Sequence, residues 1–170
     1  RVVKRSDILC QYTFKVGAYE KDKLKLINNI RAVFNSKHLV IRSSAVNEDT
    51  YESSMAGNYT SVLRVPSHDE KSIEDAVDLV IKSYLKSNQK QNSENQVLVQ
   101  PFLDGVTMSG VVLTKDLQTD SPYYRVNYDV GDDTESVTSG TGKAVKTFIC
   151  YKNFSSEIGN KHIVKLIDAI

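Results

Sequence analysis

The chain has 170 residues, of which 40% are hydrophobic and 25% are charged, a composition typical of a globular domain with a real core. Its net charge of +1 excludes a general electrostatic attraction to nucleic acid or to an anionic membrane surface. The sequence contains no apolar run long enough to span a bilayer and no signal peptide, so we expect neither a membrane nor a nucleic-acid partner.

The two cysteines, Cys10 and Cys150, do not have the spacing of metal ligands. We therefore expect a reduced, cytoplasmic setting, and the sequence leaves open a disulfide between them. The chain begins with Arg1 rather than Met and ends within an apolar periodic segment, which we interpret as a sign that it is a piece of a larger protein.

The N-terminal part of the chain is basic. Residues 1–38 contain nine Lys and Arg residues against three Asp and Glu residues, a local net charge of +6. We interpret this charge as a solvated helix face or a contact with another part of the parent protein, because no aromatic stacking pattern accompanies it. Residues 8–16 fit an edge strand or an extended linker. An amphipathic helix is predicted over about 18–34, from apolar residues at three- and four-residue steps: Leu24, Ile27, Ile30, Val33 and Phe34.

The segment 39–66 begins with the pattern of an anion site. A short apolar strand at 38–42 ends in Arg42, which is followed by the hydroxyl residues Ser43 and Ser44. A guanidinium offers a fixed fork of donors that matches phosphate oxygens, and hydroxyls and turn N–H groups can bind the same oxygens. On pattern alone, Arg42 could instead be a surface charge paired with an acidic residue of the following loop.

The middle of the chain predicts two strands around a helix and a further hairpin partner. Tyr59–Val65 is β-like in composition, and the capping-box pattern at 67–70 predicts the start of the clearest helix in the chain. We expect the apolar face of that helix, which includes Ile73, Val77, Val80 and Tyr84, to lie in the core. Val97–Leu103 predicts a buried strand. We expect 110–114 to be its antiparallel neighbour across the turn signal at 104–105.

The C-terminal part predicts strands at Tyr123–Tyr128 and 145–151 and a helix over Glu157–Ile170. Six acidic residues within 116–135 could bind a divalent cation, but they lack the spacing of an EF-hand loop. We therefore expect a solvated acidic turn and assign no metal ligand. The order of helices and strands predicts an α+β (α/β) fold with a mixed or antiparallel sheet flanked by helices.

The residues IRSSAVNEDT…SSMAGNYTSVLRV resemble the RSSA-x-x-ED…S-x-AG segment of the pyruvate phosphate dikinase and phosphoenolpyruvate synthase family, in its N-terminal ATP-grasp domain. The resemblance implies that Arg42 holds the phosphates of ATP and takes part in catalysis. It also implies that Gly57 and Ser61 lie at the nucleotide. Gly57 would let the backbone approach the ligand closely because it has no Cβ.

A second block carries the same resemblance. Gln100 falls where the family has a glutamine in the nucleotide site, and Leu103 or Phe102 falls in the hinge that hydrogen-bonds adenine. Pro101 departs from the commoner residue at its position and removes one N–H donor. The glycine-rich GLGE loop of the family is replaced here by the residues 130–135.

The resemblance covers roughly residues 35–170 and implies a partial ATP-grasp-like domain. Within it, 1–66 would contribute phosphate contacts and 67–170 would contribute the adenine side. The implied cofactors are ATP and Mg²⁺, with the metal ligands outside this chain. The family also has a lysine that would precede Arg1 and a Gln-x-Arg pair that would follow residue 170.

Two functions follow from the resemblance. The first is the ATP-binding portion of a dikinase, a phosphotransferase resembling phosphoenolpyruvate synthase, which passes phosphate from ATP through a histidine domain absent from this chain to an acceptor such as pyruvate. The second is a non-catalytic ATP-grasp-like module that senses nucleotide or serves as a scaffold in a larger protein. In either case the partners are ATP and the remaining domains of the parent protein, and we expect this chain alone to be inactive.

Overall fold

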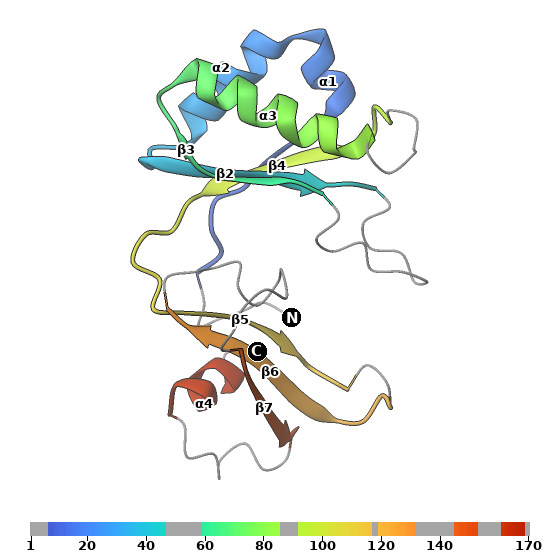
Figure 1. The fold of residues 1–170 in the computed structure, drawn as a ribbon, viewed down its shortest axis with the longest axis vertical. Helices are drawn as coiled ribbons and strands as arrows, with labels where there is room; N and C mark the ends of the chain where they lie inside the picture. Colours follow the sequence, from blue (N-terminus) through green and yellow to red (C-terminus); the bar gives the residue numbers. More distant parts are fainter. Residues whose placement is uncertain are drawn as a thin grey trace. The chain divides into compact units, whose positions relative to one another are not determined.

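The computed structural model describes residues 7–46, 59–85, 92–116, 119–131, 145–152 and 161–168. It has helices and antiparallel sheets, so the expected α+β class is confirmed (Figure 1). In chain order the elements are β1 (Tyr12–Lys15), α1 (Val16–Lys21), α2 (Lys23–Val33), β2 (His38–Ser44), β3 (Ser61–Pro66), α3 (Glu70–Leu85), β4 (Gln96–Pro101), β5 (Met108–Leu113), β6 (Tyr123–Val130), β7 (Lys146–Tyr151) and α4 (Lys161–Asp168).

The chain divides into two compact units, a first one of Leu9–Leu103 and a second one of Arg1–Ile8 together with Asp104–Ile170. Pro66 and Ser67 both lie inside the first unit. The division at 66/67 that we drew from the sequence concerns contacts with a ligand rather than compactness, and it stays a prediction.

The first unit contains a four-stranded antiparallel sheet in the order β1-β4-β2-β3. The edge strand expected within 8–16 is therefore present as β1. The expected pairing of β4 with the strand that follows it is wrong, because β4 has β1 on one side and β2 on the other. With both of its edges hydrogen-bonded, β4 has no place for β5, which pairs with β6 in a separate sheet.

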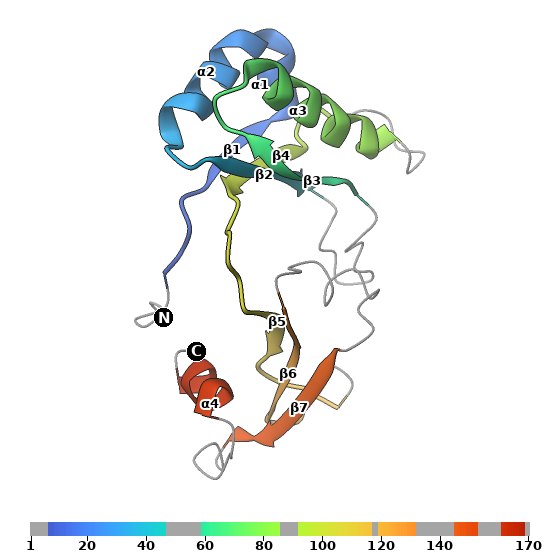
Figure 2. The same cartoon turned by 60° about the vertical axis from the view of Figure 1, so that its left-hand side comes forward.

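Helices α1, α2 and α3 cover one face of this sheet (Figures 1 and 2). The strands bury alternate residues against them, since successive side chains of a strand point to opposite faces. The core under the helices contains mainly aliphatic side chains, among them Ile27, Ile30, Leu39, Ile41, Ile73, Val77, Val80, Val97 and Val99.

The helix expected over 18–34 is in fact two helices, which meet at Asp22. Asp22 leaves the helical region, with φ −154° and ψ 77°, and its carboxylate accepts a hydrogen bond from the Lys25 N–H at 3.1 Å. An aspartate that satisfies an orphan N–H in this way starts a new helix. Leu24 and Val33, which the periodicity had placed on the buried face, are exposed.

Helix α3 begins two residues later than a cap at Ser67 would require. Asp69 is the capping residue, because its carboxylate accepts hydrogen bonds from the Lys71 N–H at 3.1 Å and from the Ser72 hydroxyl. Ser67 is buried and bonds instead to the backbone before β2: its hydroxyl donates to the carbonyl of Ser36 and its N–H to that of Lys37. The capping-box prediction was therefore wrong: the carboxylate of Asp69, and not the hydroxyl of Ser67, caps the start of the helix.

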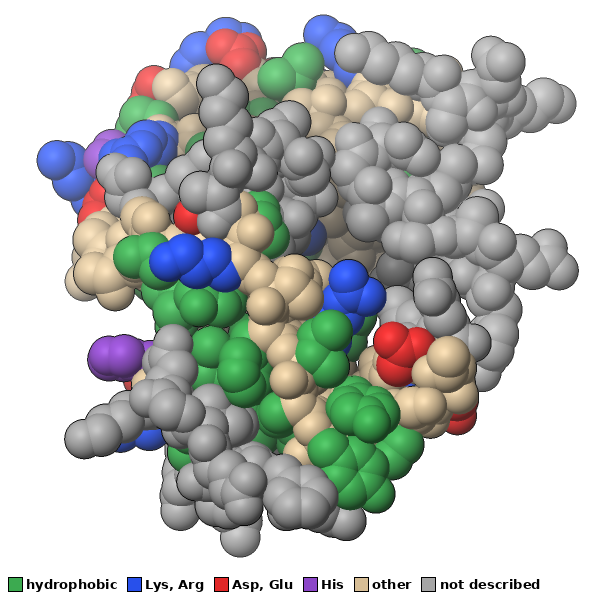
Figure 3. Space-filling model, turned by 60° about the horizontal axis from the view of Figure 1, so that its bottom comes forward, with side chains coloured by type: hydrophobic (Ala, Val, Ile, Leu, Met, Phe, Trp, Pro, Cys, Tyr) green, Lys and Arg blue, Asp and Glu red, His purple; other side chains and the backbone are tan. Residues whose placement is uncertain are grey.

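The second unit contains the antiparallel sheet β5-β6-β7, with Ile163 and Ile167 of α4 packed against Val126 of the central strand. Gly110 in β5 is required by close approach, because a Cβ there would collide with the backbone carbonyl of Asn127 in β6. Figure 3 brings the bottom of the Figure 1 view forward and shows hydrophobic side chains gathered on the surface of this unit.

Both cysteines are free thiols, Cys10 exposed and Cys150 half-buried, and burial raises the pKa of Cys150 above its ordinary value. Within the described part of the chain, no helix has the length and apolarity needed to cross a membrane.

Candidate functional site

The face of the four-stranded sheet opposite helices α1, α2 and α3 is called the uncovered face below. It carries the sequence-predicted residues that the structure describes in β2, β3 and β4. In β2, Leu39 and Ile41 are fully buried under the helices, so Val40 and Arg42 lie on the opposite, uncovered face. In β4, Val97 and Val99 are buried in the same way, which puts Gln100 on the uncovered face too.

Strand register brings these residues into two neighbouring rows. Arg42 lies directly opposite Ser61 of β3 and, on its other side, opposite Leu98 of β4. Side chains paired in this way have Cβ atoms about 4.5–5.5 Å apart. Gln100 lies opposite Val40, one row further along the sheet. Arg42, Ser61 and Gln100 therefore share one surface, which a single ligand of nucleotide size could cover.

The two hydroxyl residues after Arg42 do not share that surface. Ser43 is 7% exposed and lies on the helix-covered side, so the expectation that both hydroxyls assist at an anion site was wrong for Ser43. Alternation along the strand is the reason, because it leaves only every second residue of β2 on the face of Arg42. Ser44 lies on that face, opposite Gln96.

Helix α3 fixes the end of β2 through Tyr84. Its hydroxyl accepts a hydrogen bond from the Ser44 N–H at 3.2 Å and donates one to the carbonyl of Gln96 at 2.5 Å. One buried side chain thus ties β2 to β4 two residues beyond Arg42. Sequence reasoning treated Tyr84 only as core, and nothing in the periodicity of α3 showed that its hydroxyl serves the sheet.

The same helix holds the start of β3. The Ser83 hydroxyl accepts a hydrogen bond from the Thr60 N–H at 3.2 Å, and the ring of Tyr59 meets the ring of Tyr84 edge-on at 5.2 Å between centroids. On the β2 side, the Val46 N–H donates to the side-chain oxygen of Asn95 at 3.3 Å. Both flanks of the segment that contains Gly57 are therefore tied to the first unit, while Gly57 itself lies outside the described residues.

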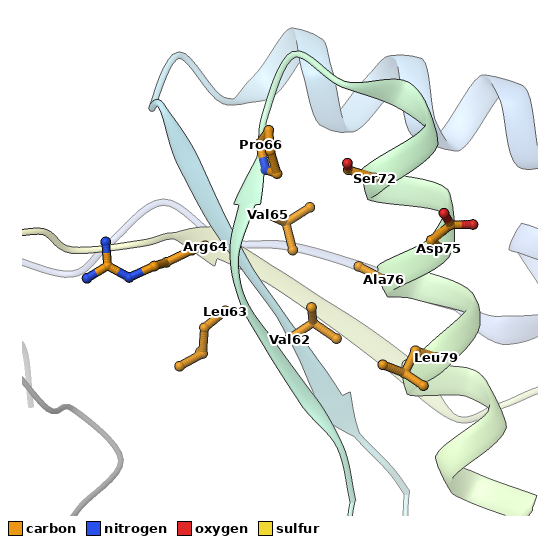
Figure 4. Close-up of a pocket in the computed structure, with 9 residues that line it drawn as sticks. All are labelled: Val62, Leu63, Arg64, Val65, Pro66, Ser72, Asp75, Ala76 and Leu79. Carbon is orange, nitrogen blue, oxygen red and sulfur yellow. The ribbon is translucent and has the colours of Figure 1, made fainter.

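Strand β3 contains a β-bulge, in which Leu63 and Arg64 together oppose Val40. Arg64 has a φ of 54°, in the left-handed region that residues other than glycine adopt rarely. Figure 4 shows Val62 and Val65 turned toward helix α3, and Leu63 and Arg64 turned to the other side of the strand. The bulge therefore adds a second arginine to the face of Arg42, and sequence reasoning missed it. The sequence contains a signal for the bulge: Val62 and Val65, which both turn toward the helices, are three residues apart, whereas residues on one face of a regular strand are two apart.

A groove of about 330 Å³ lies between β3 and α3, on the covered side of the sheet. Apolar residues of β3 and α3 line it together with the bulge residues Leu63 and Arg64, and none of the described residues that we predicted for the nucleotide site does. We therefore build the candidate site on the uncovered face and not on this groove.

Strand β4 ends at Pro101, and the next residues are those predicted to form the hinge. The Phe102 N–H donates to the carbonyl of His38 at 2.9 Å, which occupies that donor within the protein. Pro101 has no N–H to offer. Leu103, which is 50% exposed, is thus the hinge candidate that these contacts favour.

Among the described residues, no three His, Cys, Asp or Glu side chains gather into a group that could hold a metal ion. Asp132, Asp133 and Glu135 of the acidic stretch lie outside the described residues. The expectation that the Mg²⁺ ligands lie outside this chain stays a prediction.

A family model described as "Pyruvate phosphate dikinase, AMP/ATP-binding domain" matches residues 19–146, which include Arg42, Ser61 and Gln100. A search of curated proteins gave no match. The family match covers well over half of the chain and agrees with the resemblance seen in the RSSA segment. The chain therefore belongs to the family of pyruvate phosphate dikinase AMP/ATP-binding domains.

Proposed function

We propose that the chain is the ATP-binding portion of a dikinase that resembles phosphoenolpyruvate synthase, with the nucleotide on the uncovered face of the first sheet. The observation that carries the proposal is the pairing of Arg42 with Ser61, one row from Gln100. The family match supports ATP as the ligand.

Each residue has a role that its chemistry fits. The guanidinium of Arg42 would bind phosphate oxygens through two parallel N–H donors, and the hydroxyl of Ser61 would donate to the same phosphate chain. Neighbouring rows on one face of a strand lie about 6.6 Å apart. With the phosphates at the row of Arg42, the adenine end of the nucleotide would therefore reach the row of Gln100. Leu103 would offer its backbone to the adenine, and Gly57 would bring the loop backbone to the phosphates.

Phosphoryl transfer depends on positioning and on neutralising charge on the phosphate oxygens, so Arg42 would act on the transition state as well as on binding. Mg²⁺ bound with the ATP would supply further charge neutralisation, held by carboxylates from outside the described residues. In the proposed reaction, phosphate passes from ATP to a histidine of another domain and then to an acceptor, for which pyruvate is our first candidate.

Titration of the native-length protein with MgATP tests this function. We expect Arg42→Ala to weaken ATP binding by about 10- to 100-fold, the value of a charge-assisted phosphate contact, and to abolish phosphoryl transfer. Arg31→Gln is the matched control, because Arg31 belongs to helix α2 on the covered side of the sheet. This substitution should leave ATP binding and phosphoryl transfer unchanged. Since Arg42 is exposed, its variant should keep the thermal midpoint of the wild type. Wild-type turnover in Arg42→Ala would remove Arg42 from the mechanism.

A second candidate function is a non-catalytic module that senses nucleotide or acts as a scaffold. Two features of the hinge favour it: Pro101 removes one donor, and the Phe102 N–H is already engaged by His38. Transfer of labelled phosphate from ATP to the protein separates the two candidates. Tight ATP binding without any labelled protein would favour the sensing module.

A further inference from the structure

The turn at 92–95, directly before β4, is bonded to the start of helix α1. Two of its backbone carbonyls accept the first N–H groups of that helix: the Val16 N–H donates to Asn95 at 2.8 Å and the Gly17 N–H donates to Ser93 at 3.0 Å. The first N–H groups of a helix have no partner within it, so the turn carbonyls satisfy them. Gly17 is required by close approach, because a Cβ at this position would lie 2.9 Å from the Cβ of Ser93. Backbone contacts therefore give the turn a fixed place in the first unit.

Asn95 adds a connection through its side chain. It is 8% exposed, and its Oδ1 accepts a hydrogen bond from the Val46 N–H at 3.3 Å. The last backbone pair between β2 and β4 is Ser44 with Gln96, so this contact continues the pairing of the two strands past its end. An N–H beyond the end of a strand pair has no ladder partner, and the side-chain oxygen that accepts from it fixes the direction in which the chain leaves the strand.

This direction matters because of what lies on either side of Val46. Arg42 precedes it by four residues, and the segment that contains Gly57 follows it. At the far end of that segment, the Ser83 hydroxyl accepts a hydrogen bond from the Thr60 N–H at 3.2 Å. A side chain of the first unit therefore anchors each end of the segment. Fixing the ends of a segment lowers the entropy cost of holding it against a ligand.

Resting on the function proposed above, we propose that Asn95 is a positioning residue of the nucleotide site, which fixes through Val46 where the Gly57 segment leaves β2 and so sets how that segment reaches the phosphates of ATP.

The test compares three variants of the native-length protein by calorimetric titration with ATP and with adenosine. Asn95→Ala removes the acceptor of the Val46 N–H and leaves the backbone contacts of the turn in place. Asn95→Asp keeps an oxygen at the same position, and the Nδ2 that it loses donates no hydrogen bond within the described part of the chain. Asn92→Ala is the matched control, because the Oδ1 of Asn92 accepts its hydrogen bond at 3.0 Å from the Glu94 N–H, inside the same turn.

We expect Asn95→Ala to weaken ATP binding by about 3- to 10-fold, the value of one hydrogen bond, and adenosine binding by less than about 2-fold, since adenosine has no phosphate. Asn95→Asp and Asn92→Ala should stay within about 2-fold of the wild type for both ligands. Hydrogen exchange at the Val46 amide should accelerate by about 3- to 10-fold in Asn95→Ala and remain unchanged in Asn92→Ala.

Unchanged ATP binding in Asn95→Ala overturns the proposal, whether or not exchange at Val46 accelerates. Equal weakening of ATP and adenosine binding also overturns it, because the substitution would then act on the fold as a whole. The same holds if Asn92→Ala weakens ATP binding as much as Asn95→Ala does, because the effect would then belong to the turn and not to the contact with Val46.

The two proposals fail in different ways. If Arg42→Ala loses ATP affinity and Asn95→Ala does not, the proposed function stands and the role of Asn95 is refuted. If the wild-type protein binds neither ATP nor adenosine, the proposed function fails, and the role of Asn95 at the site fails with it.

Discussion

Arg42 and Ser61 face each other across β2 and β3, and the same register puts Ile41 opposite Val62 on the covered side. A shift of one residue would exchange the two faces, burying the guanidinium and exposing the core side chains. The placement of the candidate site therefore depends on the apolar residues beneath it. Tyr84 supports the same register from helix α3.

Removing the hydroxyl of Tyr84 should loosen the end of β2. In Tyr84→Phe, the Ser44 N–H and the Gln96 carbonyl both lose their hydrogen bond to a buried group. We expect a loss of about 1–3 kcal/mol in the free energy of unfolding, measured by urea denaturation, and a severalfold weaker ATP affinity. Tyr12→Phe is the matched control, since among the described residues its hydroxyl accepts an exposed hydrogen bond from Asn29, and the substitution should cost under about 0.5 kcal/mol. Equal effects of the two substitutions would contradict this role of Tyr84.

The cap of helix α3 should make stability depend on pH in the acid range. The hydrogen bond from the Ser72 hydroxyl is the largest cause that lowers the pKa of Asp69 below its ordinary value of 3.8, and the N–H of Lys71 adds to it. Because the folded pKa is depressed, this contribution is present above pH 3.8 and is lost as pH falls through the folded pKa. Asparagine can cap the helix but does not titrate.

We therefore expect the stability difference between wild type and Asp69→Asn to be constant from about pH 5 to 7 and to shrink below about pH 4. Urea midpoints measured from pH 2.5 to 7 check this expectation. Two curves that stay parallel over the whole range would show that Asp69 contributes nothing through its charge.

Gly110→Ala should destabilise the second unit. Its new methyl group would collide with the carbonyl of Asn127, and overpacking of this kind costs about 1–3 kcal/mol. Hydrogen exchange at the β6 amides is the suitable measurement, because it reports on the stability of the second unit by itself. Val111→Ala, at the neighbouring exposed position, is the control and should cost less than about 1 kcal/mol. If the β6 amides were protected as well in Gly110→Ala as in this control, the close approach of β5 and β6 at Gly110 would be refuted.

The left-handed backbone at residue 64 predicts an inverted order of substitutions. In an ordinary strand, valine stabilises more than asparagine. At a φ of 54°, however, side chains branched at Cβ are disfavoured by about 1–2 kcal/mol, and asparagine is tolerated. We expect Arg64→Asn to have a higher thermal midpoint than Arg64→Val, and the opposite order would show that the bulge does not persist in solution.

Much of the local structure could be predicted from the sequence. The apolar spacing of α3 marked Ile73, Val77 and Val80, and all three are fully buried. The alternation in β2 similarly follows from its apolar residues. These features depend on neighbours a few residues away, which a sequence displays directly.

Other features depended on single residues or on distant partners. The break at Asp22 and the bulge at Leu63–Arg64 each come from one residue that leaves the regular backbone. The pairing of β4 was missed because the turn signal at Asp104 and Gly105 is local, whereas the choice of a strand partner depends on which edges are already occupied. The residues of the candidate site came from the family resemblance, and their roles in binding remain predictions.

The insertion of β4 between β1 and β2 has a consequence for biosynthesis. A ribosome adds about 5–20 residues per second, so roughly 4–17 seconds separate the synthesis of β1, which starts at residue 12, from that of β4, which starts at residue 96. Until then β1 and β2 each keep an unpaired edge, a state in which nascent chains pair with one another. The half-made unit should therefore be a substrate for chaperones that bind extended segments, and the face that carries Arg42 and Gln100 is completed in one late step.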